Sequence, residues 1–240
     1  MHFDVLGPLR VTGAHGRVTV PAGRTSAALA WLVANANEWV SIDALVELLW
    51  RDAPATAAAK TRLMLRSLEP LLEPGTLEFA DRVRLVAAEQ AVDAWRFEGL
   101  VTEAGKLVAT GDAHRARVNL EEALGLWRGD PYPELDRALP AQAAIDRLAE
   151  LHVHAIEELN ELDLAHPDYV LVAELRSQAI LYPDRPRIRR QLALALYRTE
   201  RQVEALDVLR ELRRDLGDED GLAAALQAAF LSHDGGAVTA

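Results

Sequence analysis

Hydrophobic and polar residues alternate with the two-residue period of strands near the start of the chain, and with helical periods over most of the remainder. Two β-rich runs, residues 3–11 and 17–20, flank a turn at residues 12–16 that contains two glycines. These runs predict a β-hairpin at the start of the chain.

Three amphipathic helices are predicted after this hairpin. Apolar residues fall at helical spacing over residues 28–36, and Thr25 or Ser26 is placed to cap the first helix. Ser41 is a good N-cap for a second helix. Thr56 can cap a third helix, which has the apolar set Leu63, Leu65, Leu68, Leu71 and Leu72.

A second hairpin is predicted after the third helix. Residues 77–79 and 83–86 are β-rich and flank a short polar turn. Hairpin, three helices and hairpin, in that order, are typical of a winged helix-turn-helix. We therefore predict a winged-helix domain over residues 1–90.

The remaining chain has a longer repeat that resembles the tetratricopeptide pattern of paired helices. Such a repeat needs small residues where two antiparallel helices approach closely and large apolar residues toward the next repeat. The matching positions are Ala116, Leu120, Ala123, Leu192, Ala193, Ala205, Leu209 and Gly217, with a weaker middle stripe of Leu171, Leu175 and Ile180. We predict a helical-repeat domain over residues 94–232, closed by a helix at 221–231, and a loose tail at 233–240. The fold class is thus mainly α with a small β component.

Composition narrows the function classes. The chain has 240 residues, a formal net charge of −11 and no cysteine, which excludes disulfides, thiolate zinc sites and a cysteine nucleophile. No export signal or membrane-spanning stretch is found, so we expect a cytoplasmic protein with no membrane partner. The phosphate-loop, dinucleotide, nucleophile-elbow and zinc-protease motifs are missing, and we predict neither enzymatic activity nor a cofactor.

Five segments carry a resemblance to a known family. They are FDVLGPLRV, VSIDALVELLW, VDAWRFEGLV, GDAHRARVNLEEALGLWRGD and LVAELRSQAILYPDRPRIRRQLALALYRTERQVEAL. On these segments the chain resembles the SARP family, actinobacterial antibiotic-pathway regulators that join a response-regulator-type winged helix to a bacterial transcriptional activation domain. The resemblance implies a DNA-binding activator of a biosynthetic pathway. It also implies a homodimer on promoter direct repeats, and we expect the helical domain to contact either a neighbouring protomer or RNA polymerase.

Six basic residues are the candidate DNA contacts. Lys60, Arg62 and Arg66 lie on the third helix, where a recognition helix meets base edges, and Arg62 and Arg66 share a face. Arg82 and Arg84 fall in the wing, and Arg24 stands at the entry to the first helix, near amides that favour a phosphate. The alternative is that these side chains form an ordinary solvated surface.

Two departures from the family pattern leave a second function open. Ser67-Leu68-Glu69-Pro70 stands where an Arg-Leu-Arg-Arg run is expected, and Asp81-Arg82-Val83 replaces a Gly-Tyr in the wing. Residues 51–84 hold six basic and five acidic residues, a net charge of only +1. The alternative function is a repurposed member without DNA binding, whose helical repeats bind a protein, peptide or small molecule. Residues 96–240 carry −9, which would favour basic partners.

Three other features have structural interpretations. The five tryptophans at positions 31, 39, 50, 95 and 127 lie beside apolar positions, which favours core packing over base stacking. His154 and Glu158, one turn apart, could share a metal ion, but a polar helix face is the simpler interpretation. Residues 218–220 are acidic and precede a predicted helix, which they would cap.

Overall fold

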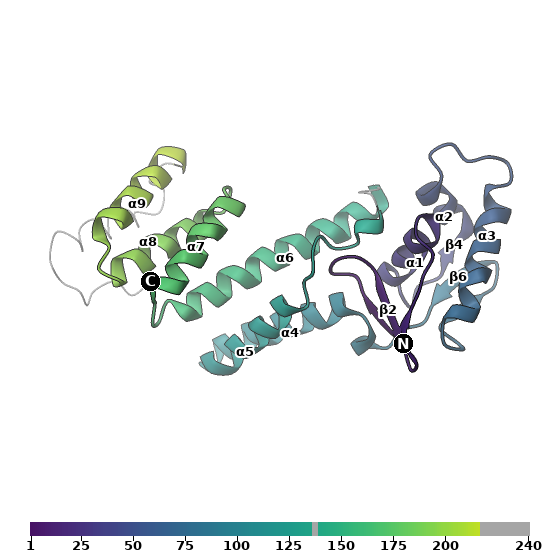
Figure 1. Ribbon diagram of the computed structural model, residues 1–240, viewed down its shortest axis with the longest axis horizontal. Helices are drawn as coiled ribbons and strands as arrows, with labels where there is room; N and C mark the ends of the chain where they lie inside the picture. Colours follow the sequence, from purple (N-terminus) through teal and green to yellow (C-terminus); the bar gives the residue numbers. More distant parts are fainter. Residues whose placement is uncertain (136–138, 217–240) are drawn as a thin grey trace. The chain divides into compact units, whose positions relative to one another are not determined.

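The structure is a computed structural model that describes residues 1–135 and 139–216 (Figure 1). Packing divides the chain into two compact units, Met1–Ala155 and the residues from Ile156 onward. Helices dominate both units, and two small antiparallel sheets lie in the first. The predicted fold class, mainly α with a small β component, is therefore confirmed.

A three-stranded antiparallel sheet opens the first unit. It consists of β1 (His2–Asp4), β2 (Arg10–Gly13) and β3 (Gly16–Val18), in the order β1-β2-β3. The hairpin predicted around residues 12–16 is confirmed by the pairing of β2 with β3. Residues 3–11 hold two strands instead of one continuous run, because Gly7 has a φ of +129° and turns the chain between β1 and β2. Phe3, Val5 and Val11 are buried, so this segment contributes apolar side chains to the core.

Three helices and a second sheet form the winged helix-turn-helix. The helices are α1 (Arg24–Ala34), α2 (Ile42–Leu49) and α3 (Ala57–Leu68), and the 3₁₀ turn η1 (Glu69–Leu71) follows. The sheet has the order β4-β6-β5, with β4 (Val40–Ser41), β5 (Leu77–Phe79) and β6 (Arg82–Leu85). The predicted wing hairpin is therefore confirmed, and β4, which directly precedes α2, adds a third strand to its sheet.

The helix caps follow the prediction in part. The Ser41 hydroxyl accepts a hydrogen bond from the N–H of Ala44 at 3.1 Å, as a good N-cap should. Thr56 occupies the N-cap position of α3 without a side-chain bond. The predicted cap of α1 at Thr25 or Ser26 is wrong: Gly23 is the N-cap, and the Ser26 hydroxyl donates to the Gly23 carbonyl at 2.9 Å.

Two apolar positions are placed wrongly by the periodic pattern. Leu63 is 74% exposed on α3, whose buried residues are Ala57, Thr61, Leu65 and Leu68. Ile180 is 80% exposed, although Leu171 and Leu175 of the same predicted stripe are buried. Both leave the buried face because helical spacing puts them on the other side of the helix, Leu63 about 160° from Leu65 and Ile180 about 140° from Leu175.

Buried polar contacts join the loop between β1 and β2 to the residues that follow the wing. The 3₁₀ turn η2 (Glu89–Ala91) leads into α4 (Asp93–Ala109). The carboxylate of Asp93, 4% exposed, accepts the N–H groups of Val5 and Leu6 at 2.7 and 3.1 Å. The N–H of Arg128 donates to the Leu6 carbonyl at 2.7 Å, and its guanidinium lies 3.6 Å from Asp93. We name these residues, Val5, Leu6, Asp93 and Arg128, the Asp93 clamp.

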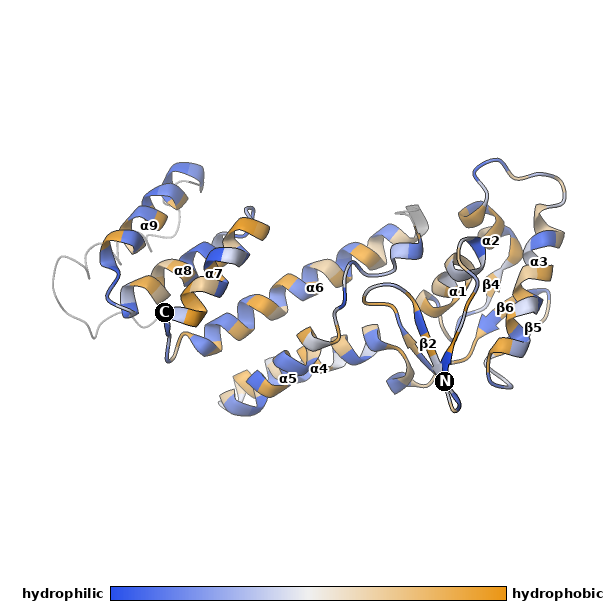
Figure 2. Cartoon of the chain, viewed as in Figure 1, coloured by the Kyte–Doolittle hydropathy of each residue, from blue (hydrophilic) through white to orange (hydrophobic). Residues whose placement is uncertain are grey.

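Packed helices make up the described residues that follow Ala91. α4 packs on α5 (Ala113–Gly125), and the 3₁₀ turn η3 (Pro133–Leu135) precedes α6 (Leu139–Asp163). α7 (Tyr169–Leu181), α8 (Pro186–Arg198) and α9 (Gln202–Leu216) follow, with α7 packed on α8 and α8 on α9. Orange and blue bands alternate along α6, as expected of an amphipathic helix (Figure 2). The predicted small and large apolar positions are buried: Ala116, Leu120, Ala123, Leu192, Ala193, Ala205 and Leu209.

A buried polar network sets the register of the second unit. Asn160 donates to Gln178 at 2.7 Å and to Gln191 at 3.3 Å. Gln191 in turn donates to the Glu157 carbonyl at 2.8 Å. Because a half-satisfied network in a core is costly, these amides favour one alignment of α6, α7 and α8 over others.

The remaining structural predictions have mixed outcomes. Trp31, Trp50, Trp95 and Trp127 are partly buried, as predicted, whereas Trp39 is exposed. Glu158 binds Arg187 at 2.5 Å, and no group of three metal-binding side chains occurs among the residues that the structure describes. No helix in the same residues is long and apolar enough to cross a bilayer. Gly217, residues 218–220, the closing helix and the tail lie outside the described residues.

The Asp93 clamp yields a stability prediction. Replacing Asp93 with Ala leaves the buried N–H groups of Val5 and Leu6 without their acceptor. We expect a loss of ~3 kcal/mol in the free energy of unfolding, because each unsatisfied buried donor costs about 1–3 kcal/mol. Urea titration followed by circular dichroism measures it. The exposed wing residue Asp81, changed to Ala, is the control and should stay within about 0.5 kcal/mol of wild type.

His152 yields a pH prediction. Its ring stacks on Trp127 at 4.0 Å between centroids, and burial lowers the pKa of His152 from 6.5 to about 4. Between these two values the unfolded chain binds more protons than the folded chain, so His152 costs stability as pH falls from 6.5 toward 4. His152→Phe keeps a stacking ring without a titrating group. Urea midpoints at several pH values should fall less steeply for it than for wild type.

A matched variant separates this effect from general acid sensitivity. His114 is exposed on α5, and His114→Phe should follow the wild-type pH profile. Parallel profiles for wild type and His152→Phe would show that the pKa of His152 is not lowered.

Candidate nucleic-acid interface

Helix α3 turns one face into the core of the winged helix and the other outward. Thr61 and Leu65 are fully buried, whereas Lys60, Arg62 and Arg66 are exposed. Since successive residues are about 100° apart on a helix, the three cations flank the side opposite the buried stripe. The structure therefore places the three helix residues predicted to contact DNA on one outward surface, which we name the α3 basic face.

Trp50, at the end of α2, organises the first part of this face. The Arg24 guanidinium lies 4.0 Å from its ring centroid and the Lys60 ammonium 5.8 Å, both within the range of cation–π attraction. The Trp50 indole N–H donates to the hydroxyl of buried Thr61 at 3.2 Å. Trp50 thereby brings Arg24 of α1 close to Lys60 of α3.

Arg24 is also held by the backbone. Its Nε donates to the Leu49 carbonyl at 3.0 Å, which fixes the guanidinium at the end of α2. The sequence predicted Arg24 beside the N-terminal amides of α1 but did not predict its contact with the Trp50 ring. Arg24, Trp50 and Lys60 lie in or at the end of three different helices, and no spacing along the chain indicates that they meet.

Arg66 is fixed between an aromatic ring and a carboxylate. Its guanidinium lies 3.9 Å from the ring centroid of Phe79 in β5, and it bonds Glu69 at 3.0 Å. Glu69 is the acidic residue at one of the positions where the sequence departs from the family pattern. Its negative charge therefore acts directly on a predicted DNA contact.

The two wing residues lie on one side of β6. Arg82 and Arg84 alternate with the buried Val83 and Leu85, so their side chains leave the same face of the strand. Arg84 bonds Glu78 through two nitrogens, at 3.0 and 2.5 Å, and lies 4.7 Å from the Trp39 ring. Arg82 is exposed, and the described residues give its side chain no carboxylate partner.

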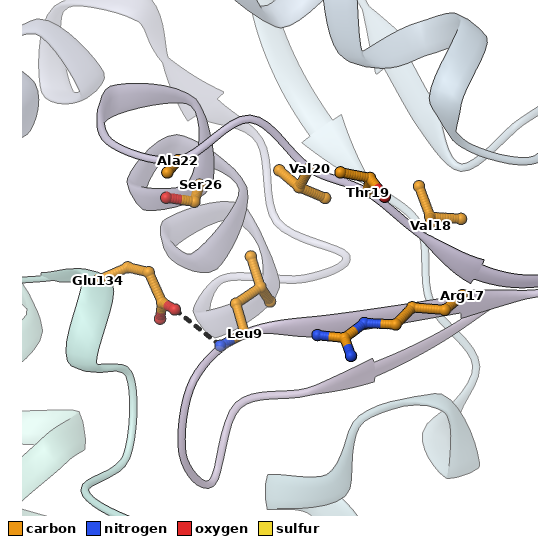
Figure 3. Close-up of a pocket in the computed structure, with 8 residues that line it drawn as sticks. All are labelled: Leu9, Arg17, Val18, Thr19, Val20, Ala22, Ser26 and Glu134. Carbon is orange, nitrogen blue, oxygen red and sulfur yellow. Dashed lines mark hydrogen bonds between the residues drawn. The ribbon is translucent and has the colours of Figure 1, made fainter.

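A separate hollow of about 280 Å³ lies in the first unit, beside β3 and the start of α1. There the carboxylate of Glu134 accepts the N–H of Leu9 at 2.7 Å, and Arg17 extends along the opposite wall (Figure 3). Its lining residues are Leu9, Arg17, Val18, Thr19, Val20, Ala22, Ser26 and Glu134. None of the six predicted contacts lines it, so we take the α3 basic face as the candidate interface.

The fold and this face define a class: a winged-helix protein that carries antiparallel helix pairs after its wing. Residues 92–230 match the family model of the bacterial transcriptional activator domain. The chain thus belongs to the SARP family of regulators, in which this domain follows a winged helix.

Relatives and a solved structure agree with this assignment. The chain is 32% identical to the regulatory protein AfsR of Streptomyces coelicolor over 92% of its own length and 23% of that protein. It is 29% identical to the transcriptional regulator RedD of the same organism, covering 66% of it. Mycobacterium tuberculosis EmbR, solved with a low-affinity phosphopeptide, superposes with a TM-score of 0.85 and 28% identity, over 97% of this chain and 65% of that one.

The pairing of Arg66 with Glu69 yields a gain-of-binding prediction. Glu69→Gln removes the carboxylate and leaves Arg66 over Phe79, free to reach a phosphate. We expect up to about fivefold tighter DNA binding at low salt, since exposed ion pairs are worth up to about 1 kcal/mol. Fluorescence anisotropy with duplex DNA measures the change.

Glu103→Gln on α4 is the matched control. It removes the same charge from a pair with Lys106 and should leave DNA affinity unchanged. Equal tightening by both variants would mean that only net charge matters and that the Arg66–Glu69 pair has no local effect.

Proposed function

We propose that this protein is a DNA-binding transcriptional regulator that places α3 in the major groove. The single observation that carries the proposal is the α3 basic face, in which Lys60, Arg62 and Arg66 all point away from the core. Phosphate neutralisation dominates DNA affinity, and a recognition helix reads bases through its exposed side. Arg82 and Arg84 would contact the backbone from the wing, and Arg24 would bind a phosphate beside α1.

The wider role of the chain follows from its family. AfsR is a regulatory protein and RedD is a transcriptional regulator, which supports the same role here. We extend this to an activator of a biosynthetic pathway, acting in the cytoplasm without enzymatic activity. The helix pairs would contact a second copy of the chain or RNA polymerase, and promoter direct repeats would seat the dimer.

A second function is favoured by one specific feature. Glu69 and Glu78 pair with Arg66 and Arg84, so two of the six candidate cations are already partly neutralised. A winged helix that no longer bound DNA would tolerate such pairs. In that case the helical repeats would bind a protein, peptide or small molecule.

A salt series distinguishes the two functions. The probe is duplex DNA from upstream of the protein's own gene, and the proteins are wild type and the variant with Lys60, Arg62 and Arg66 all changed to Ala. We expect wild type to bind with a steep dependence on salt, and the triple variant to lose about 0.9 in slope for each phosphate contact removed. Fluorescence anisotropy reports both.

The control removes the same charge from another surface. Lys106, Arg115 and Arg117 are exposed on α4 and α5, and their joint change to Ala should leave the slope unchanged. No binding by wild type at about 20 mM salt would reject the DNA-binding function and favour the second one.

A further inference from the structure

Leu63 is an apolar side chain at the centre of the α3 basic face. It stands about 200° around the helix from the fully buried Thr61, and is 74% exposed. One turn before it lies Lys60 and one turn after it lies Arg66, so cations border it along the axis. Arg62 and Arg66 fall on one side of this central line and Lys60 on the other.

Exposure alone does not assign a role to Leu63, because single exposed leucines are common on protein surfaces. The position of Leu63 on the helix is what indicates its role. The middle of the exposed side of a recognition helix lies deepest in the major groove, whereas the residues at its flanks lie nearer the phosphates. A leucine there has no donor or acceptor with which to bond a base edge.

The floor of the major groove offers one apolar group, the C5 methyl of thymine. A leucine packed on this methyl removes both from water, whereas a leucine over the polar edge of another base pair leaves acceptors and donors unmet. We infer that Leu63 is a specificity-determining residue that reads a thymine methyl in the DNA that α3 binds. The inference rests on the proposed function and adds a base preference to it.

Helix α3 would thus carry two kinds of DNA contact. Lys60, Arg62 and Arg66 set affinity and its salt dependence through phosphates or guanine edges. Leu63 contributes discrimination between bases without a charge, so its loss should leave the salt slope unchanged. This difference allows each contribution to be measured in the same binding assay.

The test compares thymine with deoxyuridine, which lacks only the C5 methyl. Wild-type protein first selects its preferred sequence from random duplexes, and that duplex is then made with single thymidine-to-deoxyuridine changes at each position. The variants are Leu63→Ala and Leu181→Ala, each made in the chain of 240 residues. Leu181 is a matched control because it is 71% exposed in α7, which lies outside the winged helix. Alanine favours helix and both sites are exposed, so both variants should fold.

We expect deoxyuridine to weaken wild-type binding about fourfold at one position per half-site, as the burial of one methyl group predicts. In Leu63→Ala that loss should disappear at the same position, with the salt slope unchanged. Leu181→Ala should keep the wild-type pattern.

Three results overturn the inference, and they are distinguishable. If wild type selects no duplex at low salt, the proposed DNA-binding function fails and the inference fails with it. If wild type binds DNA but the deoxyuridine penalties are the same in Leu63→Ala, only the inference fails. If Leu63→Ala instead weakens self-association and leaves every duplex unaffected, Leu63 contacts protein and not thymine.

Discussion

One buried carboxylate, that of Asp93, ties the start of the chain to the helices beyond the wing. Its two oxygens accept the adjacent N–H groups of Val5 and Leu6, and burial raises the pKa of Asp93 even with Arg128 nearby. Gly7 lets this loop pack closely against Arg128, because a Cβ at position 7 would lie only 2.8 Å from the Cβ of Arg128. The first compact unit therefore extends to Ala155, well past the wing.

The Asp93 clamp brings together three of the separate sequence segments that carry the family resemblance. FDVLGPLRV supplies Val5 and Leu6, VDAWRFEGLV supplies Asp93, and GDAHRARVNLEEALGLWRGD supplies Arg128. These three segments meet in one buried site. Loss of the Asp93 carboxylate would leave two buried N–H groups without an acceptor, which costs more than the contact itself contributes.

The candidate interface depends on contacts between elements as much as on its own charges. Trp50 holds Arg24 and Lys60, and Phe79 holds Arg66. Glu69 and Glu78 oppose two of the six cations. Affinity for an anionic surface would thus come from a few local side chains, on a chain whose formal charge is −11.

The sequence by itself determined the three helices of the winged helix, the wing hairpin, the Ser41 cap and the buried small residues of the helix pairs, because these follow from local spacing and capping chemistry. Only the tertiary structure decided that Thr61 is buried and Leu63 exposed. Thr61 stands one turn before buried Leu65, and its hydroxyl can be buried because it accepts the indole N–H of Trp50, eleven residues away. Hydrophobic periodicity treats threonine as polar and leucine as a core residue. It contains no information about a hydrogen-bond partner in another helix.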